Sequence, residues 1–445
     1  MPEKLFTMQP MKKPLKNNFI NPDGLNLPPV HSIPDPQSTL QAILKLPLIV
    51  AQCCGLFPLC GVTDTSANDL YFTWMAWRTL SCIFSICGSI VMAVFFYYWI
   101  SMRGLRLENL GSLVFYSTSL FCTILFFKLA RVWPKLAQEW QRLEMKFSDY
   151  PAVKNKPIKY KIILGVILVV AFVEHSLAVA ISFGWISKCT DENLGVNHIK
   201  ADFPQWFCFV EYNHMKAILV EYFNWVSTFN WNYNDIFIIL VSEVLTEKFR
   251  QINERIRQAQ NNIVGEHFYR MIRIDYTQLS HLCTSLNEAI CHLITLSFMS
   301  NIMHICIQLY NILRPRETLV EYIYFYFSLG FLLARAVSVS LYASGINDES
   351  KVPLTLLHYV SSISYNNEVS RLIQQIHALP IALTGSNFFP VTRNLLISVG
   401  GTIIAYELVL IQLPRPLTKA DLFLRNATDA QKIAYMCNVS RLCER

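Results

Sequence analysis

The stretch TLSCIFSICGSIVMAVFFYYWI, Thr79–Ile100, contains no charged side chain. A helix needs about 20 consecutive apolar residues to cross the hydrocarbon core of a bilayer, so this stretch is long enough to span one. Asn109–Phe127 and Ala289–Leu313 are also free of charge. Four more long apolar stretches carry two to four charged or histidine residues each: 161–186, 216–246, 320–346 and 393–413. The sequence therefore predicts an all-α membrane protein with seven transmembrane helices.

Composition supports a membrane protein. Charged residues make up 16% of the 445 residues and hydrophobic residues 53%, whereas a soluble protein has about 25% charged residues. No GxSxG, HExxH, P-loop or GxGxxG motif occurs, and the thirteen cysteines show no metal-ligand spacing. We therefore expect no enzyme activity, cofactor, metal or nucleic-acid partner. The N-terminus lacks the apolar core of a signal peptide, so the first span is expected to direct membrane insertion.

The distribution of basic residues predicts the orientation. The loops 134–160 and 248–285 carry six Lys or Arg each, while 102–108, 187–213 and 314–319 carry two each. Basic residues concentrate in cytoplasmic loops, which places the N-terminus in the cytoplasm and the C-terminus outside, although the C-terminal tail also holds six Lys or Arg. The two glycosylation sequons, at Asn426 and Asn438, both lie in that tail and favour the same orientation.

The predicted organisation follows from these spans. The loop 248–285 has an amphipathic, Arg-rich pattern and is expected to continue the fourth and fifth helices into the cytoplasm. The stretch Ile43–Val62 is interrupted by Lys45, Pro47, Gly55 and Pro58, which favours a re-entrant or cytoplasmic helix. The expected parts are a disordered cytoplasmic tail (1–39), the re-entrant or cytoplasmic helix (40–63), a six-helix ligand-binding bundle (74–346, with spans 74–101, 109–133, 161–186, 214–247, 286–313 and 320–346), a cytoplasmic linker (347–390), a pore-lining seventh span (391–413) and an extracellular tail (414–445).

Polar side chains inside the spans suggest a ligand pocket. Glu221, Trp225, Thr228 and Asn232 share one face of the fourth span at helical spacing. Carboxylates, amides and aromatic faces at one depth suit a polyol, although polar residues also join helices without any ligand. Arg335 and Glu174 come to a similar depth and would form a buried structural pair. The predicted ligand-binding residues are Tyr116, His175, Glu221, Trp225, Thr228, His304, Gln308 and Tyr326.

The last span carries small and amide-bearing side chains on one stripe, while Glu407 points away from it. Such a stripe suits a narrow hydrated pore, and it equally suits close helix packing. The predicted pore and gate residues are Asn394, Ser398, Gly401, Ala405, Leu408, Gln412 and Leu413.

The segment FFPVTRNLLISVGGTIIAYELVLIQL, 388–413, resembles the C-terminal signature of insect gustatory receptors, and its YELVLIQ form looks like the sugar-receptor branch. Further stretches similar to that branch are AQCCGLFPLCGV (51–62), AFVEHSLAVAIS (171–182), FNWNYNDIFIILVSE (229–243) and YFYFSLGFLLARAVSVSLYASGIND (324–348). The resemblance covers roughly 45–413. Ala405 and Leu413 depart from the signature, which usually has Thr and Phe there.

The resemblance implies a homotetrameric or heterotetrameric cation channel with related gustatory receptors, in the plasma membrane of a chemosensory neuron. In that family the last helix lines a central pore, with Gln412 and Leu413 near the outer gate. A mono- or disaccharide would bind in an extracellular-side cavity of spans one to six, and Na, K and Ca ions would permeate. A metabotropic seven-helix receptor and a secondary transporter are the alternative interpretations.

Four cysteines lie in polar segments, in contrast to those inside apolar runs. Cys189 and Cys208 share one predicted outer loop, and Cys437 and Cys443 share the C-terminal tail. An oxidising compartment would allow each pair to form a disulfide.

Overall fold

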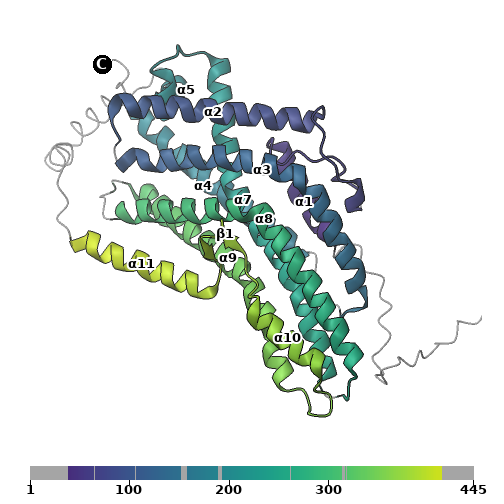
Figure 1. Ribbon diagram of the computed structural model, residues 1–445. Helices are drawn as coiled ribbons and strands as arrows, with labels where there is room; N and C mark the ends of the chain where they lie inside the picture. The colour runs from purple at the N-terminus through teal and green to yellow at the C-terminus, as the bar shows by residue number, and fades with distance from the viewer. Residues whose placement is uncertain are drawn as a thin grey trace, which may run out of the picture.

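The computed structural model describes residues 39–64, 66–105, 107–151, 158–188, 193–260, 262–312, 316 and 318–412. The chain is mostly helical, as predicted (Figure 1). Seven long helices occupy the seven predicted stretches: α2 (Trp77–Arg103), α3 (Leu107–Lys146), α4 (Ile158–Ser187), α7 (His214–Ala259), α8 (Glu266–Tyr310), α9 (Leu319–His358) and α11 (Arg393–Gln412). The shorter elements are α1 (Leu40–Cys53), α5 (Leu194–Asp202), α6 (Pro204–Phe207), α10 (Asn367–Ala378), the strands β1 (Thr384–Gly385) and β2 (Phe389–Pro390), and two 3-10 turns, Ala67–Asp69 and Phe147–Asp149.

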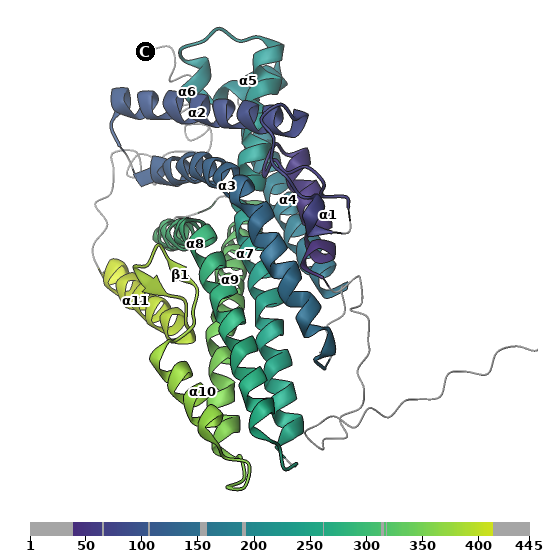
Figure 2. The same ribbon diagram turned by 45° about the vertical axis from the view of Figure 1, so that its right-hand side comes forward.

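Five of the described helices are long and apolar enough to cross a membrane, namely α2, α3, α4, α8 and α9. The helices α7 and α11 are not among these five, so seven crossings remain a prediction. The α7 helix differs because its neighbours surround it. Every residue from Asn232 to Phe249 is buried, and α7 packs most extensively against α9, with further contacts to α3, α4 and α8 (Figure 2). A helix buried inside a bundle can carry polar side chains without exposing them to lipid.

The polar side chains of α7 bond to the surrounding helices. Asn230 donates its amide to Thr123 Oγ1 on α3 at 3.0 Å, and Asn234 donates to the carbonyl of Leu293 on α8 at 3.2 Å. Each buried amide thus finds a partner on a different helix, as buried polar groups require. The α7 helix is therefore the central helix of the bundle, bonded to the helices around it.

The expected extension of the fourth and fifth spans through 248–285 is confirmed. The α7 helix continues to Ala259, a short turn follows, and α8 begins at Glu266. The stretch Ile43–Val62 holds only the 14-residue helix α1, which buries Leu44 and Leu48 against the bundle. Since 14 residues rise about 21 Å, α1 alone is too short to cross a bilayer.

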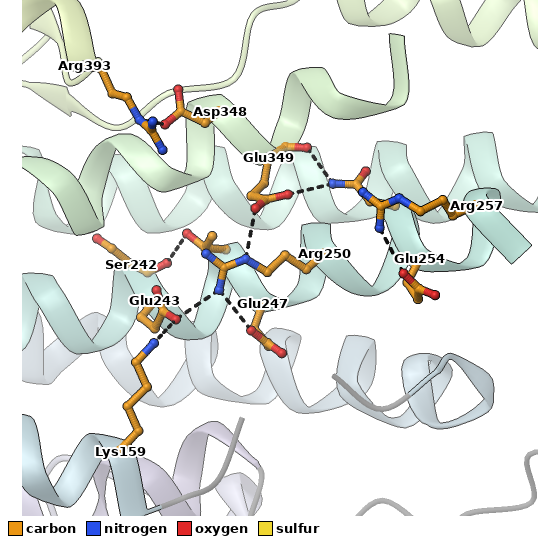
Figure 3. Close-up of polar contacts among 12 residues, drawn as sticks. Lys159, Ser242, Glu243, Glu247, Arg250, Glu254, Arg257, Asp348, Glu349 and Arg393 are labelled. Carbon is orange, nitrogen blue, oxygen red and sulfur yellow. Dashed lines mark hydrogen bonds and ion pairs between the residues drawn. The ribbon is translucent and has the colours of Figure 1, made fainter. Parts of the chain in front are cut away.

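An ion-pair network joins α4, α7 and α9 in the half of the bundle that holds the α7–α8 turn (Figure 3). Arg250 on α7 lies at its centre, 3.1 Å from Glu243, 3.3 Å from Glu247 and 3.0 Å from Glu349 of α9. Lys159 of α4 adds a contact of 2.6 Å to Glu243. Linked charges of this kind hold several helices in one arrangement more effectively than isolated surface pairs do.

The α11 helix lies at the edge of the bundle and packs chiefly against α8 and α9 (Figure 1). Its apolar side chains are largely uncovered, with Ile397 72% exposed and Ile404 64% exposed. Arg393, its first residue, pairs with Asp348 of α9 at 2.5 Å (Figure 3). Most of the α11 surface therefore has no partner within the described part of this chain.

Candidate functional site

A cavity of about 390 Å³ lies among α3, α4, α7, α8, α9 and the end of the short helix α5. It lies toward the end of the bundle opposite the α7–α8 turn, because it uses the early part of α7 and the late part of α8. Its walls combine aromatic rings with carboxylate, amide, hydroxyl, imidazole and guanidinium groups. A concave site with convergent polar groups is the arrangement expected of a small-molecule pocket.

A buried ion pair forms one wall of the cavity. Arg335 of α9 is 3% exposed and lies 2.8 Å from Asp235 of α7, measured from Nε to Oδ2. The guanidinium also donates to Asn232 at 2.5 Å and to Asn301 at 3.1 Å. Asn301 in turn donates to Asp235 at 3.1 Å. Hydrogen bonds of this kind are what allow a charge pair to persist away from water.

Trp231 provides the aromatic face beside this pair. The guanidinium carbon of Arg335 lies 4.1 Å from the Trp231 ring centroid, within cation–π range. The imidazole of His304 lies 4.4 Å from the same indole, centroid to centroid. Two cavity-lining neighbours therefore hold Trp231 in one orientation.

A relay of hydrogen bonds forms a second wall. Gln308 of α8 donates its amide to Ser328 at 3.1 Å, and Ser328 donates its hydroxyl to Glu174 of α4 at 2.7 Å. Tyr324 donates to the same carboxylate oxygen at 3.3 Å. One oxygen that accepts from two hydroxyls is the pattern of a carboxylate acceptor.

The short helices α5 and α6 lie beside the cavity. Asp202 and Phe203 contribute to its lining, and Gln205 donates to the Tyr116 hydroxyl at 3.3 Å. Ser182 donates to Asp202, and His198 lies 3.5 Å from the same carboxyl group. Burial raises the pKa of Asp202, and these two neighbours partly offset that rise.

Two buried polar atoms of cavity-lining residues lack any partner within the described chain. They are the indole N–H of Trp231 and the carbonyl oxygen of the Gln308 side chain. An unpaired buried donor or acceptor costs about 1–3 kcal/mol. Both atoms belong to lining residues, so they are candidate hydrogen-bonding groups for a ligand in the cavity.

The predicted ligand-binding residues divide into separate groups. Tyr116, His304 and Gln308 line the cavity. His175, Trp225 and Thr228 instead contact one another outside it: the His175 and Trp225 rings lie 4.1 Å apart, and Thr228 Oγ1 lies 3.4 Å from His175 Nδ1. The two remaining residues are Glu221, which is partly exposed, and Tyr326, which is 54% exposed, and neither belongs to the cavity lining.

Several lining residues were not predicted as ligand contacts. On α7 the cavity takes Asn224 and Trp231, seven residues apart and hence on one helix face, which was the available signal. Glu174 and Arg335 were interpreted as a structural pair. That pairing is wrong: Arg335 forms its ion pair with Asp235, and Glu174 instead accepts a hydrogen bond from Ser328.

The predicted pore stripe is exposed along the whole described length of α11. Its six described members are Asn394, Ser398, Gly401, Ala405, Leu408 and Gln412. Leu413 and the sequon residues Asn426 and Asn438 lie outside the described residues. Cys208 is held in a disulfide, while Cys189, Cys437 and Cys443 lie outside the described residues, so the predicted pairings stay predictions.

Comparison with known proteins identifies the family. The trehalose receptor family model matches residues 35–421. The gustatory receptor for sugar taste 64f of Drosophila melanogaster is 33% identical over 374 residues, which cover 82% of this chain and 79% of the relative. Gustatory receptor 5a for trehalose, from the same organism, is 31% identical over 369 residues, 82% of this chain and 83% of the relative.

The fold is also found in a solved structure. The insect olfactory receptor OR5 from Machilis hrabei superposes with a TM-score of 0.59 at 16% sequence identity, covering 84% of this chain and 99% of the receptor. At this sequence identity the match shows a shared fold and nothing more. The relatives are receptors, which confirms the expectation that the chain is not an enzyme. The resemblance seen in the last span is likewise confirmed, and this chain belongs to the trehalose receptor family of insect gustatory sugar receptors.

Proposed function

We propose that this chain is a subunit of a sugar-gated, non-selective cation channel in the plasma membrane of chemosensory neurons. The observation that carries the proposal is the cavity of about 390 Å³ with unpaired polar atoms on Trp231 and Gln308. A relative named as a receptor for trehalose supports a saccharide as the ligand. The membership in the family supports the receptor role.

The lining matches the two faces of a saccharide. Ring hydroxyls donate to the Glu174 carboxylate and to the free oxygen of Gln308, and the indole N–H of Trp231 donates to a ligand oxygen. The apolar C–H face lies against the aromatic rings of Trp231 and Phe331. Each hydrogen bond to a charged group contributes about 1.5–3 kcal/mol. Several such contacts are enough to favour the occupied state over the empty one.

The pore is proposed to form where four copies of α11 meet, in a homotetramer or with related gustatory receptors. Three features of α11 support this: its uncovered apolar side chains, its exposed stripe of small and amide-bearing residues, and its few contacts within the chain. Gln412 and Leu413 would stand near the outer gate. A pore closed by an apolar constriction blocks flow by dewetting, and one without a ring of charges discriminates poorly among Na, K and Ca ions.

The proposed topology has seven spans, a cytoplasmic N-terminus and an extracellular C-terminus with glycans at Asn426 and Asn438. The distribution of basic loop residues supports it. In this orientation the cavity opens toward the outside, where a tastant arrives.

Patch-clamp recording of cells that express this chain alone, with a panel of mono- and disaccharides, tests the proposal. A cation current that rises with sugar concentration is expected. The matched control is the variant Trp231→Ala, which keeps the pore residues but removes one wall of the cavity. A chain that reaches the cell surface, passes no current with any sugar and binds none would contradict the proposal.

A further inference from the structure

The charges around the cavity are not balanced. Glu174 and Asp202 line it, and Arg335 is its only lining guanidinium or ammonium group among the described residues. The charge of Arg335 is already matched by Asp235, and its three nitrogens face Asp235, Asn232 and Asn301. Little of that guanidinium is left for an anionic ligand.

Neither lining carboxylate has a strong cationic partner. The bonds of Glu174 come from two neutral hydroxyls, those of Ser328 at 2.7 Å and Tyr324 at 3.3 Å, and no ion pair to it occurs in the described part of the chain. Asp202 accepts from Ser182, and the nearest basic group is the imidazole of His198 at 3.5 Å. The cavity is therefore a region of negative potential, bordered by low-dielectric walls that strengthen it.

The remaining hydrogen-bonding groups of the lining include two acceptors. The Gln308 side-chain oxygen is buried and unpaired. His304 directs Nδ1 at the carbonyl of Ser300, 2.8 Å away, so Nδ1 carries the proton and Nε2 is the acceptor of the neutral ring. The indole N–H of Trp231 is a free donor. Together with the two lining carboxylates, these acceptors can receive hydrogen bonds from the donors of a ligand.

We propose that the cavity selects its ligands by charge: it binds polyols in which a protonated amine replaces a hydroxyl more tightly than the neutral polyol, and it rejects polyols that carry a carboxylate or phosphate. The inference rests on the proposed function, since it specifies the ligand class of the same site. An ammonium group offers three donors, and its bonds to carboxylates are about twice as strong as neutral ones.

Two matched ligand series test the proposal on the purified full-length chain. Equilibrium binding is measured at about pH 6, below the usual pKa of an amino group, for glucose, glucosamine and glucuronate, and for trehalose with its 6-amino and uronic acid analogues. Within each series the amine is expected to bind roughly tenfold more tightly than the neutral sugar, because a charge-assisted hydrogen bond replaces a neutral one. The carboxylate is expected to bind roughly tenfold more weakly than the neutral sugar, because the lining carboxylates repel it.

The variant Glu174→Gln assigns the effect to the cavity. This nearly isosteric change keeps a hydrogen-bond acceptor and removes the charge, so it should lower the affinity for the amine about tenfold more than that for the neutral sugar. Glu211→Gln is the matched control, because Glu211 is exposed and lies outside the cavity lining. It should preserve the full ranking of the three ligands.

The outcomes separate the two proposals. A chain that binds a neutral sugar but ranks the amine and carboxylate equal to it contradicts charge selection and leaves the sugar-receptor function standing. A chain that binds only the amines supports charge selection and contradicts a neutral sugar as the ligand. A chain that binds none of the six compounds overturns both.

Discussion

The helices α7 and α11 both carry polar residues inside a predicted span, yet their surroundings are opposite. From Asn232 to Phe249 every residue of α7 is buried, whereas the stripe from Asn394 to Gln412 on α11 is exposed. The polar groups of α7 bond to α3, α8 and α9. The helix α11 is tethered through Arg393 and packs chiefly against two helices.

In the proposed tetramer, the difference separates contacts within one chain from contacts between chains. A polar residue on α7 is matched by a residue elsewhere in the same sequence, so its replacement should damage folding or ligand binding. A residue on α11 finds few partners in its own chain, so its replacement should act on assembly and ion flow. The following predictions test this division.

The largest effect is expected at the buried pair. Arg335→Ala leaves Asp235 without its counter-charge, and breaking a buried pair in this way destabilises a protein by about 3–5 kcal/mol. We expect loss of folded protein, measured by fluorescence-detected size-exclusion chromatography over a temperature series. The double variant Asp235→Leu/Arg335→Met is the control, because it removes both charges together and should recover much of the lost stability. Equal melting of Arg335→Ala and the unaltered chain would contradict the structural role of this pair.

The next effect distinguishes two tryptophans of the same helix. Trp231 lines the cavity, while Trp225 is 36% exposed and lies outside it. Trp231→Ala removes an aromatic face and a free N–H, worth together about 1.5–3 kcal/mol, and should raise the half-maximal sugar concentration about 10- to 150-fold. Trp225→Ala should shift it far less. A larger shift for Trp225→Ala would place the ligand near His175 and Thr228 instead.

A smaller effect, on ion selectivity alone, is expected at the C-terminal end of α11. Gln412→Glu would add one negative charge per subunit to the proposed pore and should raise calcium permeability relative to sodium. Glu407→Gln removes a charge that lies off the stripe, and should change expression or gating more than permeability ratios. Reversal potentials in sodium, potassium and calcium solutions measure both. Unchanged ratios in Gln412→Glu would move the pore away from this stripe.

The smallest effect is expected at the tether of α11. Arg393 is 68% exposed in its side chain, so its pair with Asp348 contributes about 0–1 kcal/mol. A double-mutant cycle of Arg393→Ala and Asp348→Ala, read by thermal stability, should give a coupling in that range. A coupling of several kcal/mol would show that the assembled channel buries this pair.

Much of the fold follows from the sequence. Charge-free stretches such as Thr79–Ile100 are constrained by the bilayer alone, so their helices are predicted from composition. The continuation of α7 and α8 past the predicted spans was also predicted, since the amphipathic period persists there. The two-residue strands β1 and β2 were not, because so short a ladder has no recognisable period.

The cavity could be predicted only in part. Tyr116, His304 and Gln308 were found because polar groups inside spans are few. The predicted face of α7 was rotated by about one residue, so that it held Trp225 where the cavity has Asn224, while Asn232 belongs to both. Depth and spacing do not determine how a helix is rotated against its neighbours. The partner of Arg335 was missed for the same reason: the sequence placed Glu174 at a similar depth, but packing brings Asp235 to the guanidinium instead.

The helix α9 has a consequence for how such receptors diversify. It carries Arg335 in the cavity wall and Asp348 at the base of α11, about 20 Å apart along one helix whose only internal proline, Pro353, lies beyond both. A continuous helix of this kind would carry a displacement of its cavity stretch to the base of α11. Side chains on the cavity stretch of α9 can therefore change to suit a new tastant while the connecting stretch stays the same, so that recognition and transmission can evolve independently within a single element.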